Sequence, residues 1–263
     1  MTDDLARHAA VTALLEAATG WHAVVHRDEV TSTNDLALEQ ARAGVGPGLV
    51  VVADRQTAGR GRAGRGWEDG ANAAASLLAT ATVAAPATGA ALVPLAAGLA
   101  VVDASRSVDV DVTLKWPNDV LVADRKCAGI LVERHTVASG DVLLVGIGID
   151  VDWRGAERYG PSADWTSLAE EAGRDVDRGE LLAGLLESLS SWLPVEADDR
   201  DRLLAAYRRH CSTLGRDVEV TAPGGAPVSG HAVDVDAEGR LLVDTNRERI
   251  AVSAGDVVHL RSS

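Results

Sequence analysis

The chain has 263 residues, enough for one large domain or for a large domain joined to a small one. Its 39 acidic residues outnumber its 25 basic residues, and the net charge of −14 argues against a surface for nucleic acid or anionic membrane, which needs a basic footprint. Two cysteines without metal-ligand spacing imply no disulfide framework and fit a reducing compartment, the cytoplasm. The uncharged stretch 71–102 is interrupted by Pro and Gly, which favours a buried strand and helix over a membrane span.

The predicted elements mix helices and strands in an irregular order. Helices are expected over residues 5–19, 32–44, 92–107, 178–193 and 198–211. Strands are expected over residues 22–27, 49–53, 75–83, 112–116, 120–122, 129–134 and 142–151, and residues 56–72 read as a Gly- and Arg-rich loop. This order predicts an α+β fold rather than alternating βαβ units.

The pattern changes after residue 213. Short alternating runs at 218–221, 228–235, 241–244, 249–252 and 257–260 are separated by Pro-Gly-Gly, Glu-Gly and Ala-Gly. Such spacing is typical of a small all-β barrel of about fifty residues. We therefore expect two domains, residues 1–213 and residues 214–263.

The densest cluster of chemically active residues is the loop that begins at Gln56 and ends near Trp67. Arginines alternate there with glycines, which let backbone N–H groups approach an anion, while guanidinium groups clamp phosphate or carboxylate oxygens. This combination predicts a mobile loop that closes over an anion; a solvated flexible loop is the alternative. The same loop contains a formal Gly-x-Gly-x-x-Gly dinucleotide fingerprint, but no Asp or Glu occurs between residues 70 and 102 to bind a ribose, which argues against a Rossmann site.

Two further segments carry polar candidates. Ser32-Thr33-Asn34 and Gln56 suit a neutral ligand with amide- or urea-like edges, although Ser32 alone is equally compatible with a plain helix cap. The segment Trp116-Pro-Asn-Asp119 predicts a strand leading into a turn that presents its Asn and Asp, with a simple hairpin turn as the alternative. No Ser-His-Asp arrangement or metal cluster can be assembled from the sequence.

Lysine is almost absent from the chain. The other 23 basic residues are Arg, and only Lys115 and Lys126 remain, eleven positions apart. Lys carries its charge on a compact, rotatable ammonium group, whereas Arg carries it on a planar guanidinium. A site that needs the compact charge beside a reacting oxyanion is therefore expected to keep Lys where the rest of the chain has Arg. Gly129, three residues after Lys126, allows a ligand to approach the backbone closely.

Taken together, these motifs resemble the biotin protein ligases. The resemblance rests on Ser32-Thr-Asn34, the Gly-Arg-Gly-Arg loop, Lys-Trp-Pro-Asn-Asp and Arg-Lys126-x-Ala-Gly-Ile-Leu-Val-Glu133, in the same order and spacing, and covers about residues 26 to 260. It implies a catalytic domain related to class II aminoacyl-tRNA synthetases with a small C-terminal SH3-like domain. It also implies a reaction: biotin and ATP, with Mg²⁺, form biotinyl-5′-adenylate and pyrophosphate, and biotin is then passed to one lysine of the carrier domain of an acyl-CoA or pyruvate carboxylase.

The resemblance also assigns roles to the candidate residues. The expected catalytic residues are Lys126, Arg62 and Asp119. Biotin is expected to contact Ser32, Thr33, Asn34, Gln56, Gly59, Arg60, Gly61, Lys126 and Gly129. The nucleotide is expected to contact Arg62, Arg65, Trp67, Lys115, Asn118 and Asp150. Because a carboxylate must attack a phosphate, cations near the reacting atoms are needed, each contributing roughly 4 kcal/mol at about 4 Å and an effective dielectric near 20.

Two departures from the family pattern bear on function. Only about twenty residues precede the first expected strand, where repressor-type relatives carry a helix-turn-helix domain, so DNA binding is expected to be absent. Asp150 stands where many relatives have Asn, and an Asp carboxylate accepts a hydrogen bond but does not donate one. Three alternatives remain: a lipoate-type ligase of the same fold, a DNA-binding biotin sensor and a catalytically inactive biotin-binding module.

Overall fold

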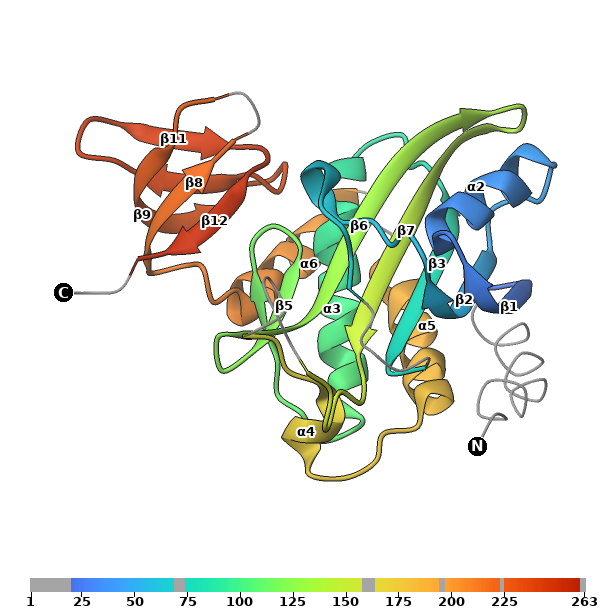
Figure 1. Cartoon of the computed structure of the whole chain (residues 1–263). Helices are drawn as coiled ribbons and strands as arrows, with labels where there is room; N and C mark the ends of the chain where they lie inside the picture. The colour runs from blue at the N-terminus through green and yellow to red at the C-terminus, as the bar shows by residue number, and fades with distance from the viewer. Residues whose placement is uncertain (1–19, 69–73, 158–163, 194–196, 223–224, 261–263) are drawn as a thin grey trace.

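The structure, a computed structural model, describes residues 20–68, 74–157, 164–193, 197–222 and 225–260. A large body built on one sheet carries a smaller β unit at its C-terminal end (Figure 1). The helix expected over residues 5–19 lies outside the described residues. Within the described part, no helix combines the length and the apolar character needed to span a membrane.

A seven-stranded mixed sheet forms the large body, in the order β1-β2-β3-β7-β6-β5-β4. Only β1 and β2 run parallel to each other; the remaining neighbours are antiparallel. This mixed sheet agrees with the predicted α+β class. The strands are β1 (Ala23–Val30), β2 (Leu49–Gln56), β3 (Ser76–Ala84), β4 (Thr113–Lys115), β5 (Asp119–Val122), β6 (Arg125–Val137) and β7 (Gly140–Asp150).

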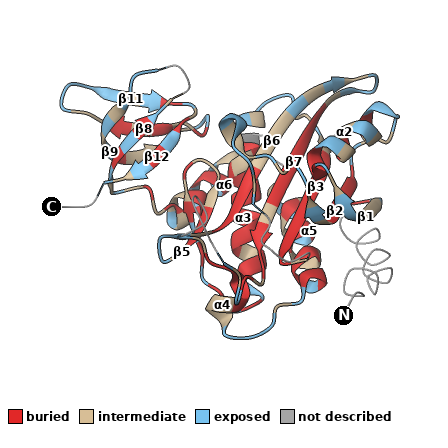
Figure 2. Ribbon diagram, viewed as in Figure 1, coloured by how far each residue is buried: buried red, intermediate tan, exposed pale blue. Residues whose placement is uncertain are grey.

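Helices cover both faces of this sheet. α3 (Val93–Arg106) is apolar on nearly every side and is buried between the sheet and α5 (Arg178–Trp192) and α6 (Ala197–His210), as expected for a helix without a solvent face. α2 (Thr33–Arg42) packs on the opposite face against β2, β3 and β7. Figure 2 shows that burial is concentrated in the central strands and α3. The sheet face that carries α2 is therefore the face on which the motif residues can gather, beside the start of that helix.

The small unit is a five-stranded antiparallel sheet in the order β11-β10-β9-β8-β12. Its strands are β8 (Asp217–Thr221), β9 (Val228–Val235), β10 (Leu241–Asp244), β11 (Arg249–Val252) and β12 (Asp256–His259). Alternate residues of β8 and β10 are buried, which is the period-2 pattern expected of half-buried strands. The five runs expected after residue 213 therefore all form strands.

Two predictions of local structure needed correction. β6 and β7 are 13 and 11 residues long. β6 extends well beyond the apolar run expected at 129–134, because the hydrogen-bonded pairing of β6 with β7 continues into residues that are exposed to solvent. A short helix, α4 (Leu168–Ala172), was not expected, since five residues are too few to show helical periodicity. It begins with a capping box in which Ser167 and Glu170 exchange hydrogen bonds with each other's backbone.

Candidate active site

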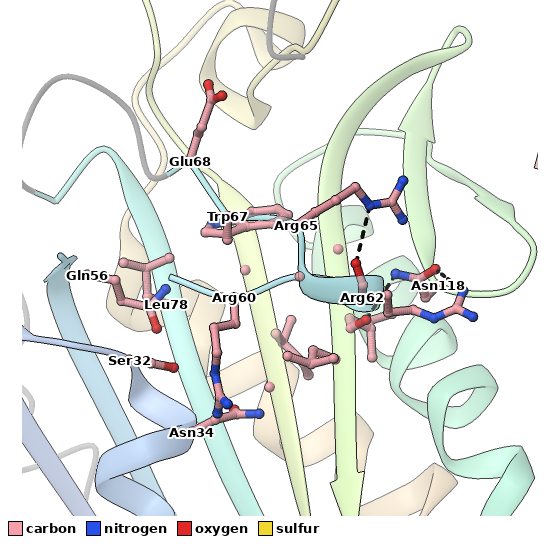
Figure 3. Close-up of a pocket in the computed structure, with 18 of the residues that line it drawn as sticks. Ser32, Asn34, Gln56, Arg60, Arg62, Arg65, Trp67, Glu68, Leu78 and Asn118 are labelled. Carbon is pink, nitrogen blue, oxygen red and sulfur yellow. Dashed lines mark hydrogen bonds between the residues drawn. The ribbon is translucent and has the colours of Figure 1, made fainter. Parts of the chain in front are cut away.

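A cavity of about 440 Å³ lies on the sheet face beside the start of α2 and under the Gly-Arg loop (Figure 3). It collects residues from segments that are far apart in the sequence. Thirteen of the residues named from sequence line it, namely Ser32, Thr33, Asn34, Gln56, Arg60, Gly61, Arg62, Arg65, Trp67, Asn118, Asp119, Lys126 and Gly129. The motifs therefore converge on one site.

Uncharged polar side chains line most of the α2 end of the cavity. The Gln56 carboxamide oxygen accepts hydrogen bonds from the Thr33 backbone N–H at 2.8 Å and the Thr33 hydroxyl at 3.1 Å. Ser32 occupies the N-cap position of α2 with extended backbone, yet its side chain makes no cap hydrogen bond and lines the cavity instead. Figure 3 shows Ser32, Asn34 and Gln56 grouped at this end. The geometry thus favours a ligand-facing role for Ser32 over the plain cap.

Arg60 is held by two carboxylates at the same end. Its guanidinium lies 2.8 Å from Asp35 and 3.0 Å from Glu133. Glu133 also accepts a hydrogen bond from the Asn34 amide at 2.7 Å. The positive charge expected of Arg60 is therefore balanced locally, and the side chain acts here as a brace between α2, β6 and the loop.

The opposite end of the cavity is cationic. Arg62 donates to the Asn118 side-chain oxygen at 2.9 Å, and burial is the main cause of its lowered pKa. Arg65 pairs with Asp256 of β12 at 2.7 Å, and Arg62 also lies 3.4 Å from the Gly255 carbonyl. Figure 3 shows Arg62 and Asn118 well separated from the polar α2 end. The small C-terminal sheet is therefore in contact with the loop that covers the site.

Lys126 lies between the two ends. Its ammonium is 2.7 Å from the Asp119 carboxylate and sits over the rings of Trp67 and Trp165, at 5.2 and 5.0 Å from their centroids. Such cation–π contacts orient a cation without neutralising it. Lys126 is therefore a partly buried charge whose partners leave one side open to the cavity that it lines.

Glycines form the floor beneath the Trp67 indole. Gly129 and Gly148 are register partners on β6 and β7, and a Cβ at either position would lie 2.6 Å from the Trp67 ring. A Cβ at Gly146 would lie 2.5 Å from the Asn34 side-chain oxygen. These strands therefore need glycine because side chains from α2 and the loop lie flat against the backbone.

Three of the named residues do not line the cavity. Lys115 is the register partner of Asp119 in the β4–β5 pair. Its charge acts on His259 of the C-terminal unit: burial, Lys115 and Arg216 together lower the pKa of His259 to about 4. Asp150 is completely buried and accepts a hydrogen bond from Ser76 at 3.2 Å, so the expected adenine contact is not available to it in this structure. The Gly59 carbonyl accepts a hydrogen bond from the Trp67 backbone N–H at 2.9 Å, which closes the base of the loop.

The sequence interpretation missed several participants. Trp165 lines the cavity and packs against Trp67 with ring centroids 5.3 Å apart and an interplanar angle of 36°. Trp153 packs against Trp165 in the same tilted way, at 5.9 Å. Glu133 belonged to a quoted motif but received no role. The signal for Trp165 was available, since this chain has six Trp, no Phe and two Tyr.

One cluster of candidate metal ligands occurs among the described residues, and it lies elsewhere. His26, Asp28 and Asp54 gather on β1 and β2, but Asp54 already pairs with His26 at 3.2 Å and with the buried Arg178 at 2.9 Å. None of the three lines the cavity. A role for this cluster in the site is not supported.

Comparisons with known proteins agree with the geometry. Residues 26–152 match the Biotin/lipoate A/B protein ligase family, and residues 213–260 match the Biotin protein ligase C terminal domain. The chain is 39% identical over 254 residues to the Biotin--[acetyl-CoA-carboxylase] ligase of Mycobacterium tuberculosis, covering 94% of this chain and 93% of that protein. It is 32% identical over 221 residues to the bifunctional ligase/repressor BirA of Escherichia coli, covering 82% and 67%.

Solved structures give the same result. A biotin protein ligase from Aquifex aeolicus in complex with biotin and ATP superimposes with a TM-score of 0.75 at 29% identity, covering 92% of this chain and all of that one. A biotin protein ligase from Leishmania major in complex with biotinyl-5-AMP matches with a TM-score of 0.61 at 25% identity, covering 92% and 99%. Sequence, fold and cavity together place this chain in the biotin/lipoate A/B protein ligase family.

Proposed function

We propose that this protein uses ATP to activate biotin as biotinyl-5′-AMP and then transfers biotin to a lysine of a biotin carboxyl carrier domain. The observation that carries the proposal is one cavity with a neutral hydrogen-bonding end, a cationic end and Lys126 between them. The relatives named as biotin–carboxylase ligases, and the solved relatives bound to biotin, ATP and biotinyl-5-AMP, support it.

The neutral end is suited to the ureido ring of biotin. Ser32, Thr33, Asn34 and Gln56 offer hydroxyl and carboxamide groups and no net charge, which matches a urea that both donates and accepts. Leu78 and Ile130 line the same cavity and can cover apolar parts of the ligand. The biotin carboxylate then points toward Lys126.

The chemistry at Lys126 follows from charge. A biotin carboxylate oxygen attacks the α-phosphorus of ATP, the new C–O–P linkage forms and pyrophosphate leaves. Both reactants are anionic, so the ammonium of Lys126 and the guanidinium of Arg62 lower the barrier by stabilising the charge that develops on the phosphate. In the second step the acceptor lysine amine attacks the activated carbonyl and AMP leaves.

Asp119 is the carboxylate closest to Lys126. Mg²⁺ in nucleotide sites is commonly held by one or two carboxylates together with substrate phosphates, and Asp119 fits that requirement. Asp119 is also proposed to take up the proton that the acceptor amine loses in the second step. The nucleotide is proposed to lie along Arg62, Arg65, Trp67 and Asn118, with Trp165 as an aromatic wall.

We also propose that residues 1–213 are the catalytic unit and residues 214–263 a supporting unit. The Trp116 indole donates to the Gly239 carbonyl at 3.0 Å, and Arg65 contacts Asp256. These contacts support a role for the small unit in holding the loop during ATP use. The acceptor is proposed to be a carrier domain of an acyl-CoA or pyruvate carboxylase, in the cytoplasm, without DNA as a partner.

Biotin-dependent ATP–pyrophosphate exchange tests the first half of the reaction. Exchange that requires biotin and is not supported by lipoic acid is the expected result, followed by incorporation of labelled biotin into an isolated carrier domain but not into a variant lacking its target lysine. Exchange driven by lipoic acid alone would establish the lipoate-type alternative. Biotin binding without exchange would establish an inactive module, and a gel shift at low salt checks the absence of DNA binding.

A further inference from the structure

The hairpin of β5 and β6 carries both Asp119 and Lys126, and its turn has an unfavourable sequence for its shape. The two strands are joined by a two-residue loop, Ala123 and Asp124. Both loop residues have a positive φ, 46° at Ala123 and 67° at Asp124. Positive φ at both positions is the mark of a type I′ turn, which favours Asn followed by Gly because these residues reach that region at little steric cost. The turn therefore depends on contacts outside the hairpin to keep this conformation.

One such contact comes from the small C-terminal unit. Arg216 directly precedes β8, and its Nη1 donates to a carboxylate oxygen of Asp124 at 2.9 Å. The two side chains are 40% and 64% exposed, and exposed ion pairs usually contribute little, partly because ordering a long side chain costs entropy. The pair is effective only if something else already holds the arginine.

His259, at the end of β12, holds it. The same Arg216 nitrogen, which carries two protons, lies 3.2 Å from Nδ1 of His259. A guanidinium only donates, so Nδ1 bears the lone pair and the neutral ring has its proton on Nε2. Nε2 lies 3.1 Å from the Thr213 hydroxyl oxygen, which also accepts the Trp116 backbone N–H at 3.0 Å. Burial, Lys115 and Arg216 lower the pKa of His259 to about 4, so the ring is neutral at neutral pH and keeps this orientation.

The small unit thereby reaches both ends of the segment 116–124, through Thr213 at one end and through Arg216 at the other. We propose that Arg216 is a positioning residue for adenylate formation, which holds the turn of the hairpin from the small unit and so keeps Asp119 and Lys126 in place. The 2.7 Å contact between these two side chains is the geometry that it preserves. The inference rests on the proposed function, which gives Asp119 and Lys126 a common substrate.

Arg216→Met keeps the length of the side chain and removes its charge. We expect kcat for biotin-dependent ATP–pyrophosphate exchange to fall about fivefold, the upper end of what one exposed ion pair contributes. The Kd for biotin should not change, because Thr33 and Gln56 lie at the other end of the cavity. Loss of biotin affinity with kcat unchanged would contradict a role at the hairpin.

A redesigned turn separates positioning from every other role of Arg216. Ala123→Asn combined with Asp124→Gly gives the loop the sequence that its shape favours and also removes the ion pair. This double variant should exchange at the wild-type rate, and Arg216→Met should have no further effect in it. An arginine that acted on the phosphates, or only on the stability of the small unit, would lower the rate equally in both turns.

Arg174→Met is the matched control. Arg174 also pairs at 2.9 Å with an exposed aspartate of positive φ, Asp109, and neither residue lines the cavity. The chemical change is the same as in Arg216→Met, so its effect on the melting temperature measures the cost of losing a surface pair. Its exchange rate should remain that of the wild type.

Nitrogen NMR of the His259 ring tests the orienting contact directly. Wild-type protein at neutral pH should carry the ring proton on Nε2. In Arg216→Met a nearby cation is lost, so the pKa of His259 should rise toward its ordinary value. A proton on Nδ1 in the wild type would overturn the contact on which the inference depends.

The outcomes distinguish this inference from the proposed function. Wild-type protein without biotin-dependent exchange overturns both. Active wild-type protein in which Arg216→Met exchanges at the full rate, or is slowed no more than Arg174→Met, overturns only the role of Arg216. An undiminished loss from Arg216→Met in the redesigned turn overturns it as well.

Discussion

Replacing Lys126 is expected to stop adenylate formation while leaving biotin bound. The ammonium lies 2.7 Å from Asp119 and beside two indole rings, and these contacts do not involve the polar end that is proposed to bind the ureido ring. Lys126→Ala removes the cation and leaves the Asp119 carboxylate facing the reacting anions. Both changes raise the barrier for attack of one anion on another, and neither alters Thr33 or Gln56.

The size of the effect follows from the charge. A unit charge about 4 Å from a developing negative charge contributes roughly 4 kcal/mol at an effective dielectric near 20, or about a thousandfold in rate. Lys126→Arg keeps the charge, but Gly129 and the Trp67 ring bound the space around the ammonium: a Cβ at Gly129 would lie 3.3 Å from the Lys126 nitrogen. A flat guanidinium displaced by about 1 Å should lower the rate about a hundredfold.

Biotin-dependent ATP–pyrophosphate exchange measures the rate, and calorimetry measures biotin binding. Lys115→Arg is the control, because Lys115 is the only other lysine and does not line the cavity. We expect it to keep the wild-type exchange rate. Wild-type exchange in Lys126→Arg would refute the requirement for a point charge, and equal losses in Lys115→Arg and Lys126→Arg would refute the placement of the two lysines.

Removing residues 214–263 is expected to lower turnover more than biotin affinity, because the truncation exposes Trp116 and releases the loop; a folded truncated protein that transfers biotin at full rate would contradict this. Amides of the loop from Gly59 to Trp67 should exchange rapidly without ligands and become protected with biotin plus a non-hydrolysable nucleotide; equal protection in both states would indicate a preformed site. Burial and nearby cations lower the pKa of His259 to about 4 from an unfolded value of 6.5, so the unfolded chain binds the extra proton between these values and stability should fall as pH drops from 6.5 to 4. His259→Gln should flatten this pH dependence in thermal melts, and an unchanged slope would argue against it.

Much of the fold was predictable because its elements carry local signals. Period-2 alternation and turn residues marked the strands of the small unit, and the uncharged run before residue 102 marked the buried α3. The strand order β1-β2-β3-β7-β6-β5-β4 was not predictable, since it depends on pairings between distant segments, such as Ser76 of β3 with Asp150 of β7. α4 was missed because one helical turn carries no periodicity.

The candidate site shows the same division. Thr33, Gln56 and Lys126 line one cavity, and each could be singled out from sequence because it belongs to a short motif near an element boundary. Asp150 does not line the cavity for a geometric reason. It shares a strand face with Gly146 and Gly148, but Ser76 and Trp153 meet at its end of the strand and it is buried there. Alternation along a strand predicts a face and says nothing of what covers it.

By itself, the sequence determined which chemical groups are available: a compact lysine charge, arginines on glycine-rich backbone, and neutral amides and hydroxyls. Only the tertiary structure decided which of these groups meet. The pairing of Arg60 with Asp35 and Glu133 and the contacts of Lys126 with Asp119 and the two indole rings depend on strand register and side-chain packing. Hydrogen bonds and charge pairs act over a few ångströms, so their partners are chosen by the fold and cannot be read from spacing along the chain.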